Sequence, residues 1–235
     1  MKACSRRTAP ARPAPTGVTL PLLRTGDLDL YHQVVGEGDL EALIERLGPA
    51  PAHVAGSSFG GSIALGLAAR RPELFRSITV HEPPLVAIVA DDPDALGQLR
   101  PTQASMDAVL AHLRKGEHRQ GARQFVEEVA MGPGTWDRLP AAVRETFVHN
   151  APTWLDEQSD PDWAKIDTDA LARCAAPVLL SGGTRSPMWL ATILDRLAAA
   201  PPRARRGTVE GAGHIPHVTH PGRYADALTR FVRTS

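Results

Sequence analysis

The chain has 235 residues, of which 43% are hydrophobic and 22% charged, with 26 basic and 26 acidic side chains. This length fits one domain with a sizeable core. A formal net charge of zero gives no electrostatic reason to expect nucleic acid or a membrane surface as a partner, and no apolar run has the length of a transmembrane helix. Two cysteines, Cys4 and Cys174, favour free thiols in a reducing compartment, which predicts a cytoplasmic protein.

The first predicted elements lie before residue 50. Residues 1–17 are basic and proline-rich without an apolar stretch, which predicts a disordered tail rather than a secretory signal, and a domain over 18–235. Residues 26–35 alternate apolar and polar side chains and predict a strand or hairpin. Residues 39–48 have one apolar helical face, with Asp39 as the N-cap and Gly48 as the stop.

Short apolar strands then alternate with helices. Strands are predicted at 53–57, 77–83, 177–183 and 206–214, and helices after residue 58 and at 188–199 and 223–232. This alternation predicts an α/β fold with a mostly parallel sheet covered on both faces.

Residues 85–172 interrupt the alternation with helical segments and most of the large aromatic side chains. Two compatible interpretations remain open: a small helical subdomain with its own aromatic core, or a cap that closes over a site at the carboxyl ends of the strands. The aromatic residues are Phe125, Trp136, Phe147, Trp154 and Trp163.

The stretch "HVAGSSFGGS" places Ser58 between Gly56 and Gly60, where a strand meets a helix. A nucleophilic serine in such a turn takes a strained backbone, and glycines two residues before and after it avoid clashes. The helix that follows directs its N-terminal N–H groups at the site, so the Phe59 N–H is a candidate donor to an oxyanion. Ser57 and Ser62 lack this flanking pattern and are weaker candidates.

A serine nucleophile needs a base, and "GAGHIPHVTH" supplies His214, His217 and His220 after the last strand. Their spacing does not place the three on one helical face, and prolines interrupt the segment, which disfavours a metal site. His214, in a glycine-flanked loop just past a strand, is the natural general base.

These motifs resemble the α/β-hydrolase superfamily, in particular its capped serine hydrolases, through "GSSFGG", "HEPP" and "GAGHIPH". The resemblance runs from about residue 39 to the end. It implies a cap at about 85–172, Ser58 as nucleophile, the Phe59 N–H in the oxyanion hole, His214 as base and no cofactor.

The chain departs from that family at the triad acid, which usually follows the third predicted strand. Here the turn reads "SGGTRSP", with Ser186 before the proline and no carboxylate until Asp195. Glu82, at the end of strand 77–83, is therefore the predicted partner of His214; the alternative is a buried structural carboxylate. His81 is expected to point to the opposite face of that strand.

A second departure concerns the family's "HG" turn, which supplies the second oxyanion N–H. Only residues 39–55 separate Gly38 from Gly56, so two strands and a helix, roughly 30 residues or more, are missing. The N-terminal part of the sheet is thus predicted to be short, with strand 53–57 at an exposed edge. Either Gly36–Gly38 form an improvised oxyanion wall, or the chain is a deletion variant of an active ancestor.

The sequence therefore predicts a serine hydrolase that acts on a small-molecule ester or related carbonyl compound through an acyl-enzyme. The alternative is a non-catalytic remnant that binds a small ligand without turnover. The exposed edge predicts association, as a homodimer, unless strand 26–35 moves in to pair with strand 53–57.

Overall fold

A computed structural model of the chain describes residues 23–25, 28–30, 36–47 and 50–235. The tail predicted for residues 1–17 and the predicted helix stop at Gly48 lie outside the described residues. The chain divides into two compact units, residues 1–33 and 34–235.

The first unit contains an antiparallel pair of short strands. β1 (Leu23–Thr25) pairs with β2 (Leu28–Leu30), with Leu23 opposite Leu30. Of the strand or hairpin predicted over 26–35, residues 28–30 are a hairpin strand, whereas 26–27 and 31–35 lie outside the described residues.

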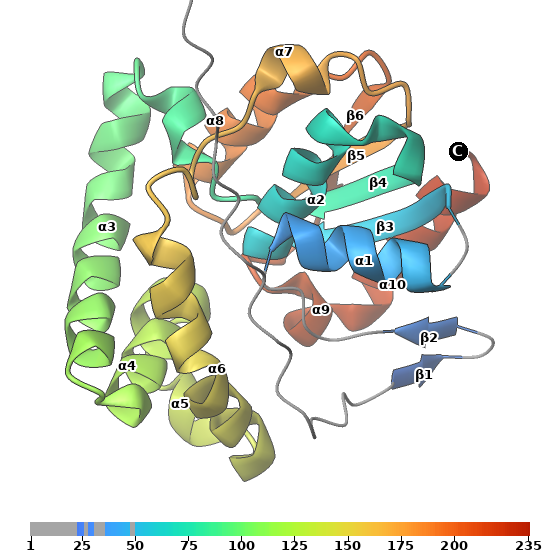
Figure 1. Ribbon diagram of the computed structural model, residues 1–235. Coiled ribbons are helices and arrows are strands. Elements are labelled where there is room, and N and C mark those ends of the chain that lie inside the picture. Colours follow the sequence, from blue (N-terminus) through green and yellow to red (C-terminus); the bar gives the residue numbers. More distant parts are fainter. Residues whose placement is uncertain (1–22, 26–27, 31–35, 48–49) are drawn as a thin grey trace, which may run out of the picture. The chain divides into compact units, whose positions relative to one another are not determined.

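The second unit is built on a parallel sheet, as predicted. Its described strands run in the order β3 (Ala52–Ser57), β4 (Phe75–His81), β5 (Val178–Gly183) and β6 (Ala204–Val209) (Figure 1). Because the strands are parallel and consecutive, their carboxyl ends meet at one edge of the sheet. Ser58, Glu82 and the loop with His214 all follow strand ends at that edge.

Helices pack against the sheet because they are apolar where they meet it. α1 (Glu37–Leu47) and α2 (Phe59–Arg70) lie in front of the strands in Figure 1, and α10 (Pro221–Arg233) lies behind them. α1 begins two residues before Asp39, so Asp39 lies in the first turn rather than at the N-cap. The core contains fully buried side chains of α2, the central strands and α8 (Met188–Ala198), among them Leu65, Leu67, Ile78, Leu180 and Ile193.

β3 lies at one edge of the described sheet. It pairs with β4, and the side chains of His53 and Ala55 are exposed. Within the first unit, β2, the described part of the strand expected at 26–35, pairs with β1. The shortening of the sheet predicted before β3 involves residues that lie in part outside the described ones, and it stays a prediction.

Residues 85–172 contain helices and no strand, as predicted, and they form small apolar clusters of their own. One cluster contains Trp154 and Phe125, and the other contains Trp136 and Phe147. The elements are η2 (Val86–Val89), α3 (Pro93–Arg114), α4 (His118–Gln124), the π-helical η3 (Phe125–Ala130), α5 (Thr135–Arg138), α6 (Ala141–Ser159) and α7 (Thr168–Leu171). The short η1 (Pro72–Leu74) and α9 (Pro216–Thr219) lie outside this insertion.

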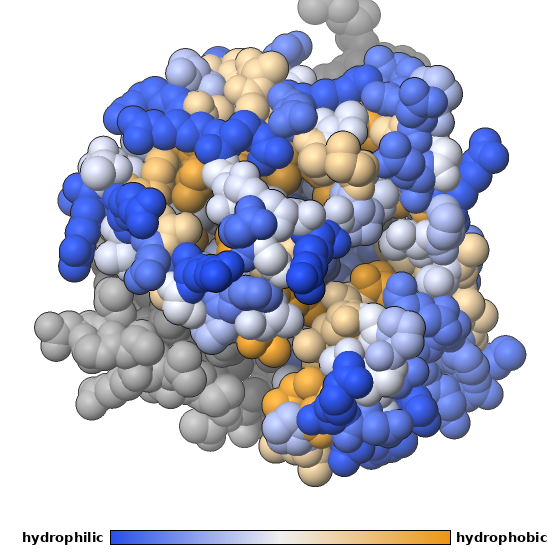
Figure 2. All heavy atoms as spheres, turned by 180° about the vertical axis from the view of Figure 1, so that it is seen from behind, coloured by the Kyte–Doolittle hydropathy of each residue, from blue (hydrophilic) through white to orange (hydrophobic). Residues whose placement is uncertain are grey.

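Hydrophilic side chains cover most of the face seen in Figure 2, with smaller hydrophobic areas between them. Among the described residues, no helix combines the length and apolar character needed to cross a membrane.

Candidate active site

Ser58 occupies a sharp turn between β3 and α2. Its φ of 53° and ψ of −126° lie outside the ordinary regions for a residue with a side chain, and its N–H donates to the His81 carbonyl at 2.8 Å. A Cβ at Gly56 would overlap the backbone of Gly60 and Gly61, so glycine is required there. The same prediction for Gly60 is wrong, because a Cβ there would meet nothing within 4 Å; the second crowded position is Gly61, against Val80.

Glu82 has the same backbone irregularity one strand further along. Its φ is 46°, and its N–H donates to the Ser181 carbonyl on β5 at 3.1 Å. Among the described non-glycine residues, Ser58 and Glu82 alone have positive φ. Such backbone strain costs about 1–3 kcal/mol per residue and persists where the surrounding structure imposes it, commonly at functional sites.

The structure brings the three residues predicted from the sequence together. Ser58 Oγ lies 3.0 Å from His214 Nε2, and His214 Nδ1 lies 2.8 Å from Glu82 Oε2. An ionised carboxylate only accepts hydrogen bonds, so His214 Nδ1 carries a proton that it donates to Glu82. The lone pair on Nε2 is then free to accept the Ser58 hydroxyl proton.

The Glu82 carboxylate is 1% exposed, and both of its oxygens are hydrogen-bonded. Oε1 accepts the Gly183 N–H at 2.7 Å, while Oε2 faces His214. Burial raises the pKa of Glu82, but its hydrogen bonds, first of all the one from His214, outweigh burial and hold the pKa below the usual value of 4.5. Glu82 is therefore a carboxylate at neutral pH.

The turn where the family usually carries its acid contains no competing carboxylate. Ser186 is there, with a buried hydroxyl beside Glu82 whose interaction helps to hold the pKa of that carboxyl down. Asp195, the next acid in the sequence, pairs with Arg206 at 2.8 Å on the surface. Neither replaces Glu82 as the partner of His214.

His81 lies closer to the site than predicted. It is fully buried, Nδ1 is 3.0 Å from Ser181 Oγ, and Nε2 is 3.7 Å from Glu82 Oε2. Burial lowers the pKa of His81 to about 4, against the opposing effect of the Glu82 charge. His81 is thus neutral at physiological pH and adds no positive charge beside Glu82.

The N-terminus of α2 lies at Ser58, since Ser58 is the N-cap and Phe59 is the first residue of the helix. The first N–H groups of a helix have no intrahelical acceptor, so the Phe59 N–H is free to donate to a ligand. Gly36, one of the residues expected to form an oxyanion wall, lines the same cavity as Phe59.

Besides the cavity that Gly36 and Phe59 line, an apolar pocket of about 230 Å³ opens directly at Ser58 and His214. The helical insertion supplies half of the residues in its wall, including Phe125, Met131, Leu139, Val143 and Phe147. Phe125 and Phe147, predicted as core residues of the insertion, therefore also line the pocket that contains Ser58. His217 and Val218, which the sequence did not single out for this pocket, complete it on the His214 side.

Two of the exposed large hydrophobic side chains of the described chain, Val143 (39% exposed) and Val218 (52%), line this pocket. Its apolar lining therefore continues to the surface. His220, the last histidine of the motif, instead contacts Thr219 Oγ1 at 2.9 Å. In the described residues no three His, Cys, Asp or Glu side chains form a group that could hold a metal ion.

Comparison with known proteins agrees with this architecture. The model of the alpha/beta hydrolase family matches residues 6–227. The pimeloyl-[acyl-carrier protein] methyl ester esterase of Chromobacterium violaceum is 30% identical over 205 residues, covering 83% of this chain and 77% of that protein. The enzyme of the same name from Xanthomonas campestris pv. campestris strain B100 is 29% identical over 180 residues, covering 75% and 69%.

Solved structures show the same fold. An alpha/beta hydrolase from Sphaerobacter thermophilus has a TM-score of 0.55 at 26% identity, covering 88% of this chain and 78% of that one. An alpha/beta hydrolase enzyme from a Medee basin deep-sea metagenome library has a TM-score of 0.61 at 17% identity, covering 89% and 76%. The sheet, the serine turn and these matches lead to one conclusion: the chain belongs to the alpha/beta hydrolase family.

Proposed function

We propose that this protein hydrolyses a carboxylic ester of a small molecule through an acyl-enzyme on Ser58. The observation that carries the proposal is the continuous hydrogen-bonded chain from Ser58 through His214 to Glu82, with distances of 3.0 and 2.8 Å. A serine is activated when a base lies within hydrogen-bond reach of its hydroxyl and an acid within hydrogen-bond reach orients that base.

The first half of the reaction forms the acyl-enzyme. Ser58 Oγ attacks the ester carbonyl carbon while His214 Nε2 takes its proton, and the carbonyl oxygen becomes an oxyanion that the Phe59 N–H stabilises. The tetrahedral intermediate then collapses, the bond to the alcohol oxygen breaks, and His214 returns the proton to that oxygen.

The second half repeats these steps with water. His214 Nε2 removes a proton from the water as it attacks the acyl carbon, and then protonates Ser58 Oγ as the acid product leaves. Glu82 keeps the Nδ1 proton in place and stabilises the imidazolium formed in each half, since its lowered pKa keeps it ionised.

The apolar pocket indicates what the ester carries near its carbonyl. A volume of about 230 Å³ lined by Phe125, Phe147 and aliphatic side chains suits a short hydrocarbon group. The names of the relatives from Chromobacterium and Xanthomonas, methyl ester esterases, support a carboxylic ester as the reacting group.

The test is to treat the purified protein with a fluorophosphonate probe and with short-chain nitrophenyl esters. We expect the phosphonyl adduct on Ser58 and on no other serine, and we expect Ser58→Ala and His214→Ala to lower turnover by about 10⁴-fold or more, because triad members act as a unit. Ser105→Ala is the matched control, since Ser105 is a partly exposed serine of α3 that lines neither the apolar pocket nor the cavity beside Phe59.

An adduct on a different serine, or unchanged turnover in Ser58→Ala, would contradict the proposal. The alternative, a remnant that binds a ligand without turnover, predicts neither adduct nor hydrolysis, together with measurable ligand binding.

A further inference from the structure

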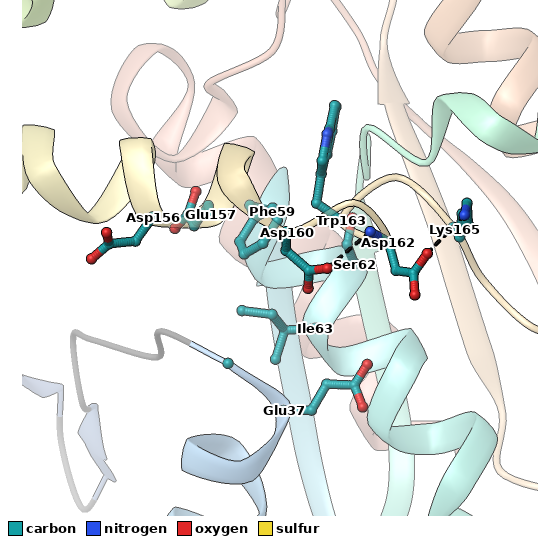
Figure 3. A pocket seen from close by; sticks show the side chains of 11 residues that line it. Glu37, Phe59, Ser62, Ile63, Asp156, Glu157, Asp160, Asp162, Trp163 and Lys165 are labelled. Atoms are coloured by element: carbon teal, nitrogen blue, oxygen red, sulfur yellow. Dashed lines mark hydrogen bonds and ion pairs between the residues drawn. The ribbon is translucent and has the colours of Figure 1, made fainter. Parts of the chain in front are cut away.

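A larger cavity, of about 450 Å³, shares no lining residue with the apolar pocket. Figure 3 shows the side chains that line it. Ser58 lines the apolar pocket and the next residue, Phe59, lines this cavity, so the two meet the chain at adjacent positions. Its wall combines the start of α1, the first turns of α2 and the end of α6 with the segment that follows it.

The cavity is lined by five carboxylates and one amine: Glu37, Asp156, Glu157, Asp160, Asp162 and Lys165. The amine is already used, since Lys165 Nζ lies 2.7 Å from Asp162 Oδ1. Glu37 pairs with Arg70 on α2. In the described part of the chain, Asp156 and Glu157 have no ion pair, so their charges are uncompensated.

The electrostatics of Glu157 agree with that excess of negative charge. Burial first, and then the neighbouring Asp156, raise the pKa of Glu157 to about 7. A bound cation would oppose both effects, because it favours the ionised carboxylate.

A second, independent feature is a buried hydroxyl that lacks a partner. Ser62 lines the cavity and is 8% exposed, and its Oγ has no hydrogen-bond partner among the described residues. Buried polar atoms are almost always paired, so this hydroxyl has hydrogen-bonding capacity that the described chain leaves unused. An N–H of a ligand in the cavity would use it once the Ser62 side chain turns toward the cavity.

The rest of the wall is aromatic and aliphatic, with Trp163, Phe59 and Ile63 (Figure 3). Aromatic faces attract organic cations as well as apolar surface. In the described chain no three carboxylates come together as a metal site would need, so the wall fits an organic cation better than a metal ion.

We propose that this cavity binds the primary ammonium group of an ester substrate whose carbonyl reacts at Ser58. The inference rests on the proposed hydrolysis and specifies its substrate class: an ester with an apolar portion on one side of the carbonyl and a cationic chain on the other. An ammonium supplies three donors for Ser62 and the unpaired carboxylates, whereas an anionic chain meets repulsion.

The experiment compares three methyl esters of similar length at pH 8, where Glu157 is ionised: methyl 6-aminohexanoate, methyl heptanoate and monomethyl adipate. We expect kcat/KM to be about tenfold or more higher for the ammonium ester than for the neutral one, and lowest for the carboxylate, since each partly exposed ion pair contributes about two- to fivefold.

The double variant Asp156→Asn/Glu157→Gln is expected to lower the ammonium-to-neutral ratio by about fivefold. Asp226→Asn, an exposed acid of α10 outside both cavities, removes charge without touching the site and is expected to leave the ratio unchanged. Equal kcat/KM for the three esters, or a ratio that the double variant does not change, overturns the inference.

Titration calorimetry of Ser58→Ala with the ammonium and neutral esters separates this inference from the proposed function. Binding of the ammonium ester that the double variant weakens, together with no ester turnover by the protein with Ser58 intact, supports the cavity and contradicts the hydrolase. Turnover of the neutral ester with no preferential binding of the ammonium ester supports the hydrolase and overturns the cation site.

Discussion

Replacing Glu82 by glutamine probes the acid partner of His214 with almost no change in shape. The two carboxylate oxygens have different tasks, because Oε1 accepts from the Gly183 N–H and Oε2 accepts from His214 Nδ1. A glutamine has one oxygen for these two donors. With the oxygen toward Gly183, the glutamine NH₂ faces His214 and forces the imidazole proton onto Nε2. A protonated Nε2 can no longer accept the Ser58 hydroxyl proton. With the amide reversed, two N–H groups face each other at Gly183.

The first orientation disables the base, and the second keeps the bond to Nδ1 but loses the negative charge that stabilises the imidazolium and leaves the Gly183 N–H unmatched. We therefore expect Glu82→Gln to lower turnover by about 10⁴-fold, the loss measured for the corresponding change in a serine protease triad. That loss corresponds to about 5 kcal/mol of transition-state stabilisation. The fold is expected to persist, with a change in unfolding free energy of about 1–3 kcal/mol for the unmatched buried hydrogen bond. The assay is kcat/KM with nitrophenyl esters beside urea unfolding of the same samples.

Glu210→Gln is the matched control, since Glu210 is an exposed acid in the loop before His214 that contacts Thr184. We expect it to retain turnover. A loss of less than about tenfold in Glu82→Gln, or an equal loss in both variants, would show that Glu82 does not orient His214.

Four further predictions address the turn, two titrating groups and the sheet edge. Gly56→Ala is expected to destabilise the fold in urea by about 1–3 kcal/mol, while Gly60→Ala is neutral or stabilises by up to about 1 kcal/mol. Because the pKa of His81 is lowered from 6.5 to about 4, the unfolded chain binds a proton between these pH values that the folded chain does not. The unfolding free energy therefore falls by up to about 3 kcal/mol as the pH falls from 6.5 to about 4, and we expect His81→Gln to remove this fall in urea titrations at pH 7 and 5. The raised pKa of Glu157 gives a pH dependence of the opposite sign. The unfolding free energy falls by about 1–2 kcal/mol, after allowing for partial exposure, as the pH rises from 4.5 to about 7, and we expect Glu157→Gln to abolish this fall. With the Phe59 N–H as a single oxyanion donor, we expect turnover about 10²–10³-fold below that of a complete site, and self-association through β3; a monomer in sedimentation that hydrolyses esters at ordinary enzyme rates would contradict both expectations.

The parts of the site that depend on local conformation were predictable from the sequence. The turn at Ser58 follows from Gly56 and from a strand that runs directly into a helix, and these features lie within a few residues of one another. The parallel sheet follows from short apolar strands separated by helices. Glu82 was predicted as the acid because it ends a strand and because no carboxylate occupies the turn at Ser186.

Only the tertiary structure decided which side chains meet. The distance between Glu82 and His214 depends on the register of strands far apart in the chain, and Glu82, at its positive φ, is hydrogen-bonded to Ser181 on β5. The requirement for glycine at position 61 rather than 60 likewise depends on Val80 of the neighbouring strand.

The acidic cavity shows the same limit most clearly. Its wall joins α1, α2 and the segment after α6, three regions that are distant in sequence and that carry no motif in common. Local sequence determines backbone conformation because its interactions are short-range, whereas a cavity is the space left between elements after they pack. For this protein, the sequence by itself therefore predicted the class of fold and the candidate nucleophile and base, and packing decided the charge and shape of the space around them.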